Sequence, residues 1–141
     1  MKVLITGANR GIGRGLYDSY AARGDDVIGT TRGEAAPGWV QLDVTSSESQ
    51  CAMATQMTDQ PVDLLICNAG VYLDKGQSLN AGYPADMWAQ TFAANVAGVF
   101  MSVQSVLSNL RAAKGKVAII SSQMASHTRA PGGSYIYRAS K

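Results

Sequence analysis

Short apolar runs rich in β-branched residues alternate along this chain with segments of helical length, and that alternation limits the folds it can adopt. The apolar runs occupy residues 2–6, 27–31, 39–44, 62–67 and 116–121. The helical segments occupy residues 12–23, 45–58 and 85–113, the second opened by a capping box of Thr45 and Glu48 and the third interrupted near residues 95–98. Nearly continuous apolar strands joined by helices are typical of a parallel sheet covered on both faces. We therefore predict an α/β fold, a doubly wound parallel sheet, with residues 1–141 in a single domain.

The composition of the chain excludes several classes of partner. Its 141 residues carry a formal net charge of +2 with acids and bases interspersed, so neither nucleic acid nor an anionic membrane is an expected partner. Residues 87–110 lack charge, yet their many Gln, Asn and Ser side chains favour a buried helix over a membrane span. Cys51 and Cys67 have no metal-ligand spacing, and we predict two buried free thiols in a cytoplasmic protein.

A glycine-rich turn follows the first predicted strand and precedes the first predicted helix. The sequence "TGANRGIG" places its glycines in the spacing G-x-x-x-G-x-G. Glycine permits the tight turn and lets backbone N–H groups approach a pyrophosphate at the start of the helix. Because the turn lies between a strand and a helix, we predict a dinucleotide-binding site there. The predicted binding residues of this turn are Gly7, Asn9, Arg10, Gly11, Ile12 and Gly13.

Further short motifs follow the later strands in a recognisable order. They are "LDV" at residues 42–44, "NAG" at 68–70, "NVAG" at 95–98, a serine pair at 121–122 and Y-x-x-x-K at 137–141. Together with the glycine turn, this set resembles the short-chain dehydrogenase/reductase family over the entire chain, and "IISSQMAS" and "YRASK" are similar to carbonyl-reductase-like and C-signal-like members. The resemblance implies a Rossmann-type fold, a nicotinamide cofactor and oxidoreductase activity on carbonyl or alcohol groups.

The end of the second predicted strand bears on which nicotinamide cofactor is preferred. An acid there would bind the adenosine ribose 2′-hydroxyl and repel a 2′-phosphate, but this chain has Thr30, Thr31 and Arg32. In the family's fold, Arg10 of the glycine turn lies near the same ribose. Two guanidiniums can bind a phosphate bidentately, whereas the simpler interpretation is two solvated surface arginines. We predict that NADP(H) is preferred over NAD(H).

The resemblance also implies adenosine-binding roles for two of the motifs. Asp43 would accept a hydrogen bond from the adenine amino group, with the Val44 backbone beside it. A simple cap for the turn after its strand is the alternative role for Asp43. Asn68, Ala69 and Gly70 would lie against the adenosine ribose and brace the sheet.

The last residues of the chain contain the candidate catalytic group. Tyr137 and Lys141 are four positions apart and share one face of a helix, whereas Tyr135 points elsewhere. A neighbouring ammonium stabilises a phenolate, so we predict that Tyr137 exchanges a proton with the substrate oxygen. The resemblance implies that Lys141 also hydrogen-bonds the nicotinamide ribose.

Two further polar residues complete the catalytic set that the resemblance implies. Ser122, with Ser121 as the alternative, would hold the substrate carbonyl against the tyrosine, and Asn95 would hold a water that links the lysine to solvent. Ser122 stands fifteen positions before Tyr137, a longer spacing than is usual in the family. We attribute the excess to an enlarged loop, "HTRAPGGS", because its Pro-Gly-Gly sequence can absorb insertions.

These features predict an NADPH-dependent oxidoreductase that reduces a small ketone or aldehyde to an alcohol. The alternatives are a non-catalytic dinucleotide-binding regulator or signalling protein on the same fold and a sugar-nucleotide epimerase, whose glycine spacing fits less well. His127 is the only histidine, so neither a Ser-His-Asp triad nor a His-based metal site is predicted. The resemblance further implies a homodimer or homotetramer, and it leaves the substrate open.

The place of Lys141 in the sequence implies a longer domain. A single helical turn is not stable in isolation, and members of the family continue with the rest of that helix, further strands and a segment over the substrate. We therefore expect residues 1–141 to be the N-terminal portion of a short-chain dehydrogenase/reductase domain, with most of the substrate pocket in the remainder.

Overall fold

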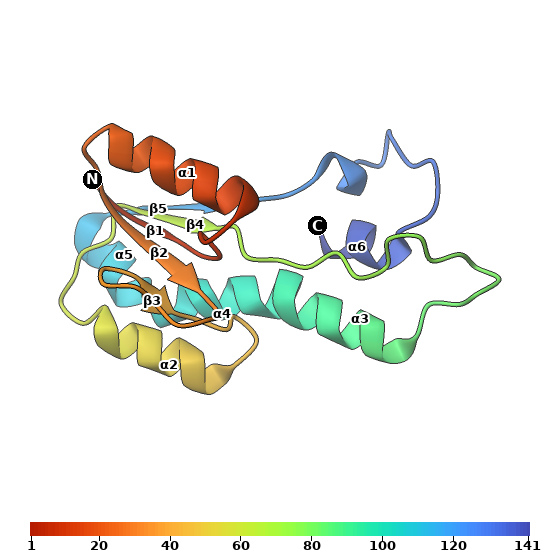
Figure 1. Ribbon diagram of the computed structural model, residues 1–141, viewed down its shortest axis with the longest axis horizontal. Coiled ribbons are helices and arrows are strands. Elements are labelled where there is room, and N and C mark those ends of the chain that lie inside the picture. Colours follow the sequence, from red (N-terminus) through yellow and green to blue (C-terminus); the bar gives the residue numbers. More distant parts are fainter.

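A sheet of five parallel strands lies at the centre of the computed structural model, which describes residues 1–141 (Figure 1). The strands are β1 (Lys2–Ile5), β2 (Asp26–Thr31), β3 (Val40–Gln41), β4 (Leu64–Cys67) and β5 (Lys116–Ile119). Their order in the sheet is β3-β2-β1-β4-β5, and every neighbouring pair is parallel. The predicted doubly wound α/β fold is confirmed.

Helices lie on both faces of this sheet. α1 (Gly11–Ala22) covers one face, whereas α2 (Ser47–Gln56), α4 (Gly98–Ser105) and α5 (Leu107–Ala113) cover the other (Figure 1). The remaining helical segments are α3 (Ala85–Phe92), the π-helix η1 (Ala93–Ala97), the short 3-10 helix η2 (Gln123–Ala125) and α6 (Tyr135–Ser140). α3 and α6 contact each other beyond the carboxyl ends of the strands (Figure 1).

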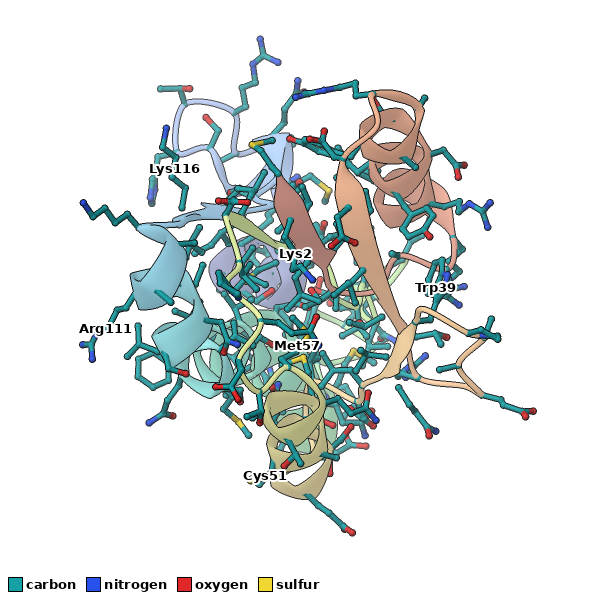
Figure 2. All side chains as sticks on the ribbon, turned by 90° about the vertical axis from the view of Figure 1, so that its left-hand side faces the viewer. Lys2, Trp39, Cys51, Met57, Arg111 and Lys116 are labelled. Atoms are coloured by element: carbon teal, nitrogen blue, oxygen red, sulfur yellow. The ribbon has the colours of Figure 1, made fainter.

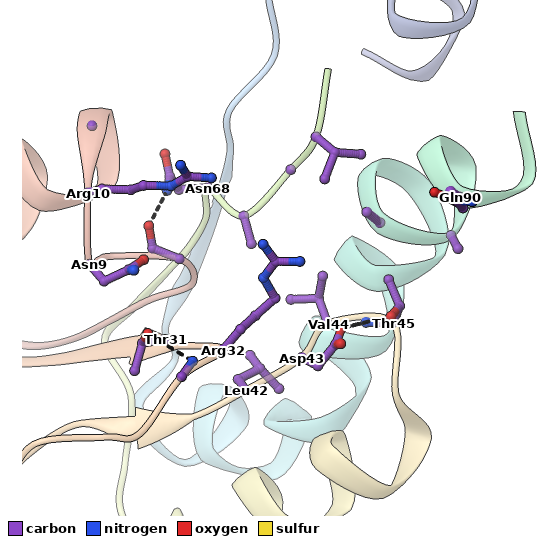
Figure 3. Close-up of a pocket in the computed structure, with 18 of the residues that line it drawn as sticks. Asn9, Arg10, Thr31, Arg32, Leu42, Asp43, Val44, Thr45, Asn68 and Gln90 are labelled. Carbon is purple, nitrogen blue, oxygen red and sulfur yellow. Dashed lines mark hydrogen bonds between the residues drawn. The ribbon is translucent and has the colours of Figure 1, made fainter. Parts of the chain in front are cut away.

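The chain reverses its direction of winding between β1 and β4. It proceeds from β1 outward to β2 and β3, and then returns to the other side of β1 to form β4 and β5. In a doubly wound sheet, ligands bind beyond the carboxyl ends of the strands at this point. A cleft lies there, lined by residues that follow β1, β2 and β4 (Figure 3).

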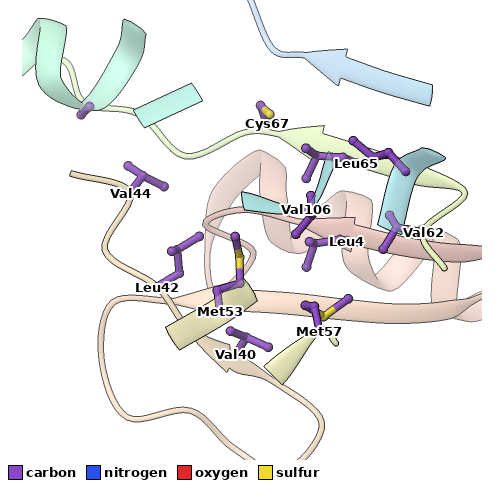
Figure 4. Close-up of a cluster of buried hydrophobic side chains, with 12 residues drawn as sticks. Leu4, Val40, Leu42, Val44, Met53, Met57, Val62, Leu65, Cys67 and Val106 are labelled. Carbon is purple, nitrogen blue, oxygen red and sulfur yellow. The ribbon is translucent and has the colours of Figure 1, made fainter. Parts of the chain in front are cut away.

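The core is divided into two layers by the sheet. Leu4 belongs to a cluster of 12 buried residues, which also includes Met53, Met57 and Val106, between the sheet and α2, α4 and α5 (Figure 4). Because side chains alternate along a strand, its neighbours Val3 and Ile5 face the opposite layer under α1. The glycine turn after β1 is therefore supported from both faces of the sheet.

The start of α2 differs from the predicted capping box. The N-cap is Ser46, whose Oγ accepts a hydrogen bond from the Ser49 amide at 3.1 Å, rather than Thr45 paired with Glu48. The Thr45 hydroxyl instead donates a hydrogen bond to Asp43 Oδ1 at 2.7 Å. The same turn ends β3 at Gln41, earlier than the predicted strand over residues 39–44.

The predicted interruption near residues 95–98 corresponds to the π-helix η1, which widens the helix between α3 and α4 without ending it. The sharper change of direction comes later, at Val106, with a bend of 57° before α5. No single helix is long and apolar enough to cross a bilayer, and only the bent pair Ala85–Ser105 and Leu107–Ala113 satisfies the criteria of length and composition.

The two cysteines lie in different environments. Cys67, at the end of β4, is buried as predicted, and burial raises the pKa of its thiol to about 11. Cys51 was also predicted to be buried, but it is exposed on the outer face of α2 (Figure 2). The buried side chains of α2, Gln50 and Met53, point to the core, whereas Cys51 falls on another side of the helix.

Candidate active site

The glycine turn has a conformation that only glycine adopts without strain at two of its positions. Gly7 and Gly11 have φ values of +64° and +58°. The turn is tied to β2, because the Gly7 amide donates to Thr30 Oγ1 at 3.1 Å and the Ala8 amide donates to the Thr30 carbonyl at 2.9 Å. The third glycine, Gly13, is needed for close packing, since a Cβ there would overlap the Gly7 carbonyl oxygen and Asn68 Nδ2.

Asn68 connects this turn to the end of β4 across the point where the winding reverses. Its side-chain amide donates to the Thr6 and Gly7 carbonyls, both at 3.0 Å. In return, the buried Thr6 hydroxyl accepts from the Asn68 and Ala69 amides, both at 3.0 Å. The glycine turn and the "NAG" segment are therefore held as one unit.

A cleft of about 1010 Å³ opens beside this unit. α1 begins there without a side-chain cap and without an acid in its first turn, so the amides of that turn remain for an anion. Arg10 and Arg32 both extend into the cleft, and neither guanidinium forms an ion pair or hydrogen bond within the chain (Figure 3). An anionic ligand can therefore bind both guanidiniums without breaking an existing ion pair or hydrogen bond.

Asp43 lies on the far wall of the same cleft and also caps its own turn. Its Oδ1 accepts from the Thr45 hydroxyl at 2.7 Å and from the Thr45 amide at 2.9 Å. These two hydrogen bonds, with a smaller contribution from the charge of Arg32, lower the pKa of Asp43. Asp43 thus caps its turn through Oδ1. Its Oδ2 accepts no hydrogen bond within the chain and can accept one from a ligand in the cleft.

A second cavity, of about 260 Å³, adjoins the first and contains the candidate catalytic side chains. The two cavities share the lining residues Ile12, Asn68, Gly70 and Val71. Tyr137 and Lys141 both line the smaller cavity, and the Tyr137 hydroxyl has no hydrogen-bond partner within the chain. Burial lowers the pKa of Lys141.

Both candidate serines line this smaller cavity, and they have different partners. Ser122 Oγ accepts from the Met124 amide at 3.1 Å and so caps η2. Ser121 Oγ donates to the Lys141 carbonyl at 2.8 Å. The Ser122 hydroxyl hydrogen therefore remains available to a substrate oxygen, whereas that of Ser121 is already donated.

Asn95 lies behind the cavity rather than in its wall. It is buried in the π-helix η1, where its side chain accepts from the Val71 amide at 2.8 Å and donates to the Val71 carbonyl at 2.9 Å. Its Nδ2 also donates to Ser140 Oγ at 2.8 Å, directly before Lys141. Asn95 thus links η1, the segment after β4 and the helix of Tyr137.

The structure brings most of the predicted site residues to these two cavities. Those that line the larger one are Gly7, Asn9, Arg10, Gly11, Ile12, Arg32, Asp43, Val44, Asn68, Ala69 and Gly70. Ser122, Tyr137 and Lys141 line the smaller one, whereas Gly13 and Asn95 lie behind the walls. Sequence reasoning missed the bracing residues Thr6 and Asp74, since a threonine in a strand and an acid in a loop carry no distinctive spacing.

Comparison with known proteins identifies the family. The family model described as short chain dehydrogenase matches residues 1–141. This chain belongs to the short chain dehydrogenase family. Among the curated relatives, the 3-oxoacyl-[acyl-carrier-protein] reductase FabG of Vibrio cholerae is 32% identical over an alignment of 117 residues that covers 74% of this chain and 47% of that protein. FabG of Escherichia coli is 30% identical over 152 residues, covering 98% and 60%. The chain spans about half the length of these curated relatives.

Solved structures of family members agree over almost the whole chain. A short-chain dehydrogenase/reductase from Burkholderia multivorans with bound NADP has a TM-score of 0.87 and 26% identity, with 99% of this chain and 67% of that chain covered. A carbonyl reductase from Pseudomonas aeruginosa has a TM-score of 0.85 and 31% identity, with 99% and 70% covered. The sheet, the helices and the turns at the ends of the strands thus have the family's arrangement.

Proposed function

We propose that this chain is the cofactor-binding and catalytic portion of an NADPH-dependent oxidoreductase that reduces a ketone or aldehyde. The observation that carries the proposal is the convergence of Ser122, Tyr137 and Lys141 on a cavity that adjoins the cleft at the glycine turn. A dinucleotide-binding regulator would need the cleft alone. The names of related proteins, reductases of a 3-oxoacyl group or of carbonyls, support the same reaction type.

The cleft has the features that NADPH requires. The glycines with positive φ and the uncapped amides at the start of α1 suit its pyrophosphate, and Arg10 and Arg32 suit its 2′-phosphate. Asp43 and residues 68–70 would lie along the adenosine, and Lys141 would donate to the nicotinamide ribose. When bound, NADPH supplies a hydride to the carbonyl carbon, and the relative with bound NADP supports this choice of cofactor.

The side chains of the smaller cavity would manage the substrate oxygen. As the C=O π electrons move onto oxygen, the Tyr137 phenol donates its proton to that oxygen, so the products are an alcohol, NADP⁺ and a phenolate that solvent reprotonates. The Lys141 ammonium stabilises the phenolate, and the Ser122 hydroxyl donates a hydrogen bond to the oxygen during the transfer. We propose that Asn95 keeps the helix of Tyr137 in register and supports the return of a proton from solvent to Tyr137. We also propose that the protein is a cytoplasmic homo-oligomer.

A Tyr137→Phe variant of the whole protein tests the catalytic assignment. Because the phenol is the proton donor, carbonyl-dependent oxidation of NADPH should fall by a factor of about 100 or more, while NADPH binding stays within a few-fold. Stopped assays across a panel of ketones and aldehydes measure the first quantity and calorimetry the second. Turnover of the variant at the wild-type rate would refute the role of Tyr137, and a wild-type protein that binds NADPH but reduces no carbonyl would favour the regulator.

An Arg32→Ser variant tests the cofactor preference. Removal of a guanidinium from the 2′-phosphate should weaken NADPH binding about 10-fold or more, since a charge-assisted hydrogen bond contributes about 1.5–3 kcal/mol, and should leave NADH binding nearly unchanged. Arg14→Ser, which removes an arginine paired with Asp18 on the outer face of α1, is the matched control. Equal losses for NADPH and NADH in the Arg32 variant would contradict the assignment.

A further inference from the structure

The helix that carries Tyr137 has no cap of its own. α6 begins at Tyr135, and its N-cap residue Ser134 has a φ of +49° with no side-chain hydrogen bond to the first turn. The first amides of a helix have no partner within the helix. Those of α6 therefore need acceptors from another part of the chain.

Asp74, in the loop after β4, makes the missing cap. It is fully buried, and its Oδ2 accepts from the Ile136 amide at 2.9 Å and from the Tyr137 amide at 3.3 Å. Asp74 forms no ion pair, so the two amides at the positive end of α6 are its partners. A buried carboxylate is costly without such partners, which makes the contact between Asp74 and the backbone of Tyr137 specific.

The same loop also contacts the Tyr137 side chain. The Tyr72 ring stacks on the Tyr137 ring with centroids 4.3 Å apart and an angle of 25° between the planes. The Tyr72 hydroxyl is 2.6 Å from Ser134 Oγ, next to the start of α6. Asn95 fixes the backbone of Val71 by accepting from its amide and donating to its carbonyl, so residues 71–74 are anchored at one end and contact α6 at the other.

We propose that Asp74 and Tyr72 are positioning residues, which set the place and direction of the Tyr137 phenol in the smaller cavity. Asp74 holds the backbone of Tyr137, and Tyr72 restricts its ring to one side. The catalytic consequence rests on the proposed function, whereas the effect on the phenol's surroundings does not. A displacement of about 1 Å at a reacting group can lower a rate 100-fold.

The kinetic test compares Asp74→Ala with Asp63→Ala in the whole protein. Asp63 is a matched control, because its Oδ2 also accepts from a backbone amide, that of Lys2 at 2.7 Å, but at the opposite end of the strands. Asp74→Ala should lower kcat about 10- to 100-fold and leave the binding of adenosine 2′,5′-bisphosphate, a probe of the larger cleft, within about twofold. Asp63→Ala should leave kcat within about twofold.

Asp74→Asn keeps one acceptor oxygen for Ile136 and should restore part of the rate. A kcat in Asp74→Ala within about twofold of wild type, or an equal loss in Asp63→Ala, would overturn the proposal.

A spectroscopic test separates this inference from the proposed function. In protein labelled with ¹³C at tyrosine Cζ, the Tyr137 signal is identified by its loss in Tyr137→Phe. It should change its chemical shift in Asp74→Ala and in Tyr72→Ala, but not in Asp63→Ala, and Tyr72→Phe, which keeps the stacked ring, should change it least. These shifts need no turnover, so they test the positioning even if the wild-type protein reduces no carbonyl. Should Asp74→Ala not fold, an unchanged Tyr137 signal in Tyr72→Ala together with a wild-type signal in Asp74→Asn would overturn the proposal.

Discussion

Thr45 ties the carboxylate of Asp43 to the turn before α2, and it does so with both its hydroxyl and its amide. Replacement by valine would remove the hydroxyl, whose hydrogen bond is the largest of the causes that lower the pKa of Asp43, and would keep the shape of the side chain. Thr45→Val should therefore raise that pKa and lower the free energy of unfolding at pH 7 by about 1 kcal/mol.

The pH dependence of this loss has a definite sign. Because the pKa of Asp43 is lower in the folded than in the unfolded state, its contribution to stability is present above the unfolded value of about 3.9 and is lost as the pH falls through the folded value. The difference between Thr45→Val and wild type should thus shrink between pH 7 and pH 3 in urea unfolding. A difference of equal size at both pH values would mean that the hydroxyl acts independently of the Asp43 charge.

Individual residues also show where sequence reasoning reaches its limit. Ser46 and Thr45 are adjacent hydroxyl residues before a helix, and the sequence favoured Thr45 because Glu48 completes its motif. The structure uses Ser46, since Asp43 competes for the Thr45 hydroxyl. Asp74 could not be predicted at all, because its partner amides lie 62 and 63 residues further along the chain.

Among the elements, the glycine turn and α1 are closely packed where they join. Gly13 and Gly15 lie two positions apart in α1, yet a Cβ at Gly13 would overlap the Gly7 carbonyl oxygen and Asn68 Nδ2, whereas nothing lies within 4 Å of a Cβ at Gly15. Gly13→Ala should therefore destabilise the protein by about 1–3 kcal/mol and weaken NADPH binding by displacing the turn.

Gly15→Ala is the control for helix propensity alone. It should stabilise the protein by about 0.5–1 kcal/mol, because alanine loses less backbone entropy than glycine in a helix. Thermal unfolding with and without NADPH measures both variants. A Gly13→Ala protein that is as stable as Gly15→Ala would show that α1 can move away from Asn68 at little cost.

The five strands and the longer helices were largely predictable, because short apolar runs mark the strands and the segments between them have helical length. Gly24, which follows α1, has a φ of +83°, the left-handed conformation that commonly ends a helix. The ends of elements were less predictable where side chains bond to the backbone, as after β3. The 57° bend at Val106 carries no Pro or Gly signal, and it follows from the packing of Val106 and Leu110 in the core.

The whole molecule exposes apolar side chains on the helix opposite α1. Val96 and Phe100, one helical turn apart in η1 and α4, are 45% and 68% exposed. Large exposed apolar groups at helical spacing are typical of an interface, which agrees with the homo-oligomer we propose. Phe100→Glu should convert the oligomer to monomer in sedimentation velocity experiments.

Leu79→Glu is the matched control for that change. Leu79 is 73% exposed but lies in the loop before α3, away from the proposed interface, so the same gain of charge should leave the assembly intact. Equal dissociation by both variants would point to a general effect of charge, and an unchanged oligomer in Phe100→Glu would place the interface elsewhere.

The hydrogen bonds that assemble the two cavities join residues far apart in the chain: Thr6 with Asn68, Asp74 with Ile136, and Asn95 with Ser140, at separations of 62, 62 and 45 residues. Such non-local contacts raise the contact order and slow folding, because loop closure is completed before the contacts form. During synthesis, the glycine turn leaves the ribosome before β4, to which it is hydrogen-bonded in the folded chain. Tyr137 follows residues 71–74, which contact its helix, so it becomes ordered after them. A nascent chain of this protein can therefore form its larger cleft before Tyr137 has a fixed position.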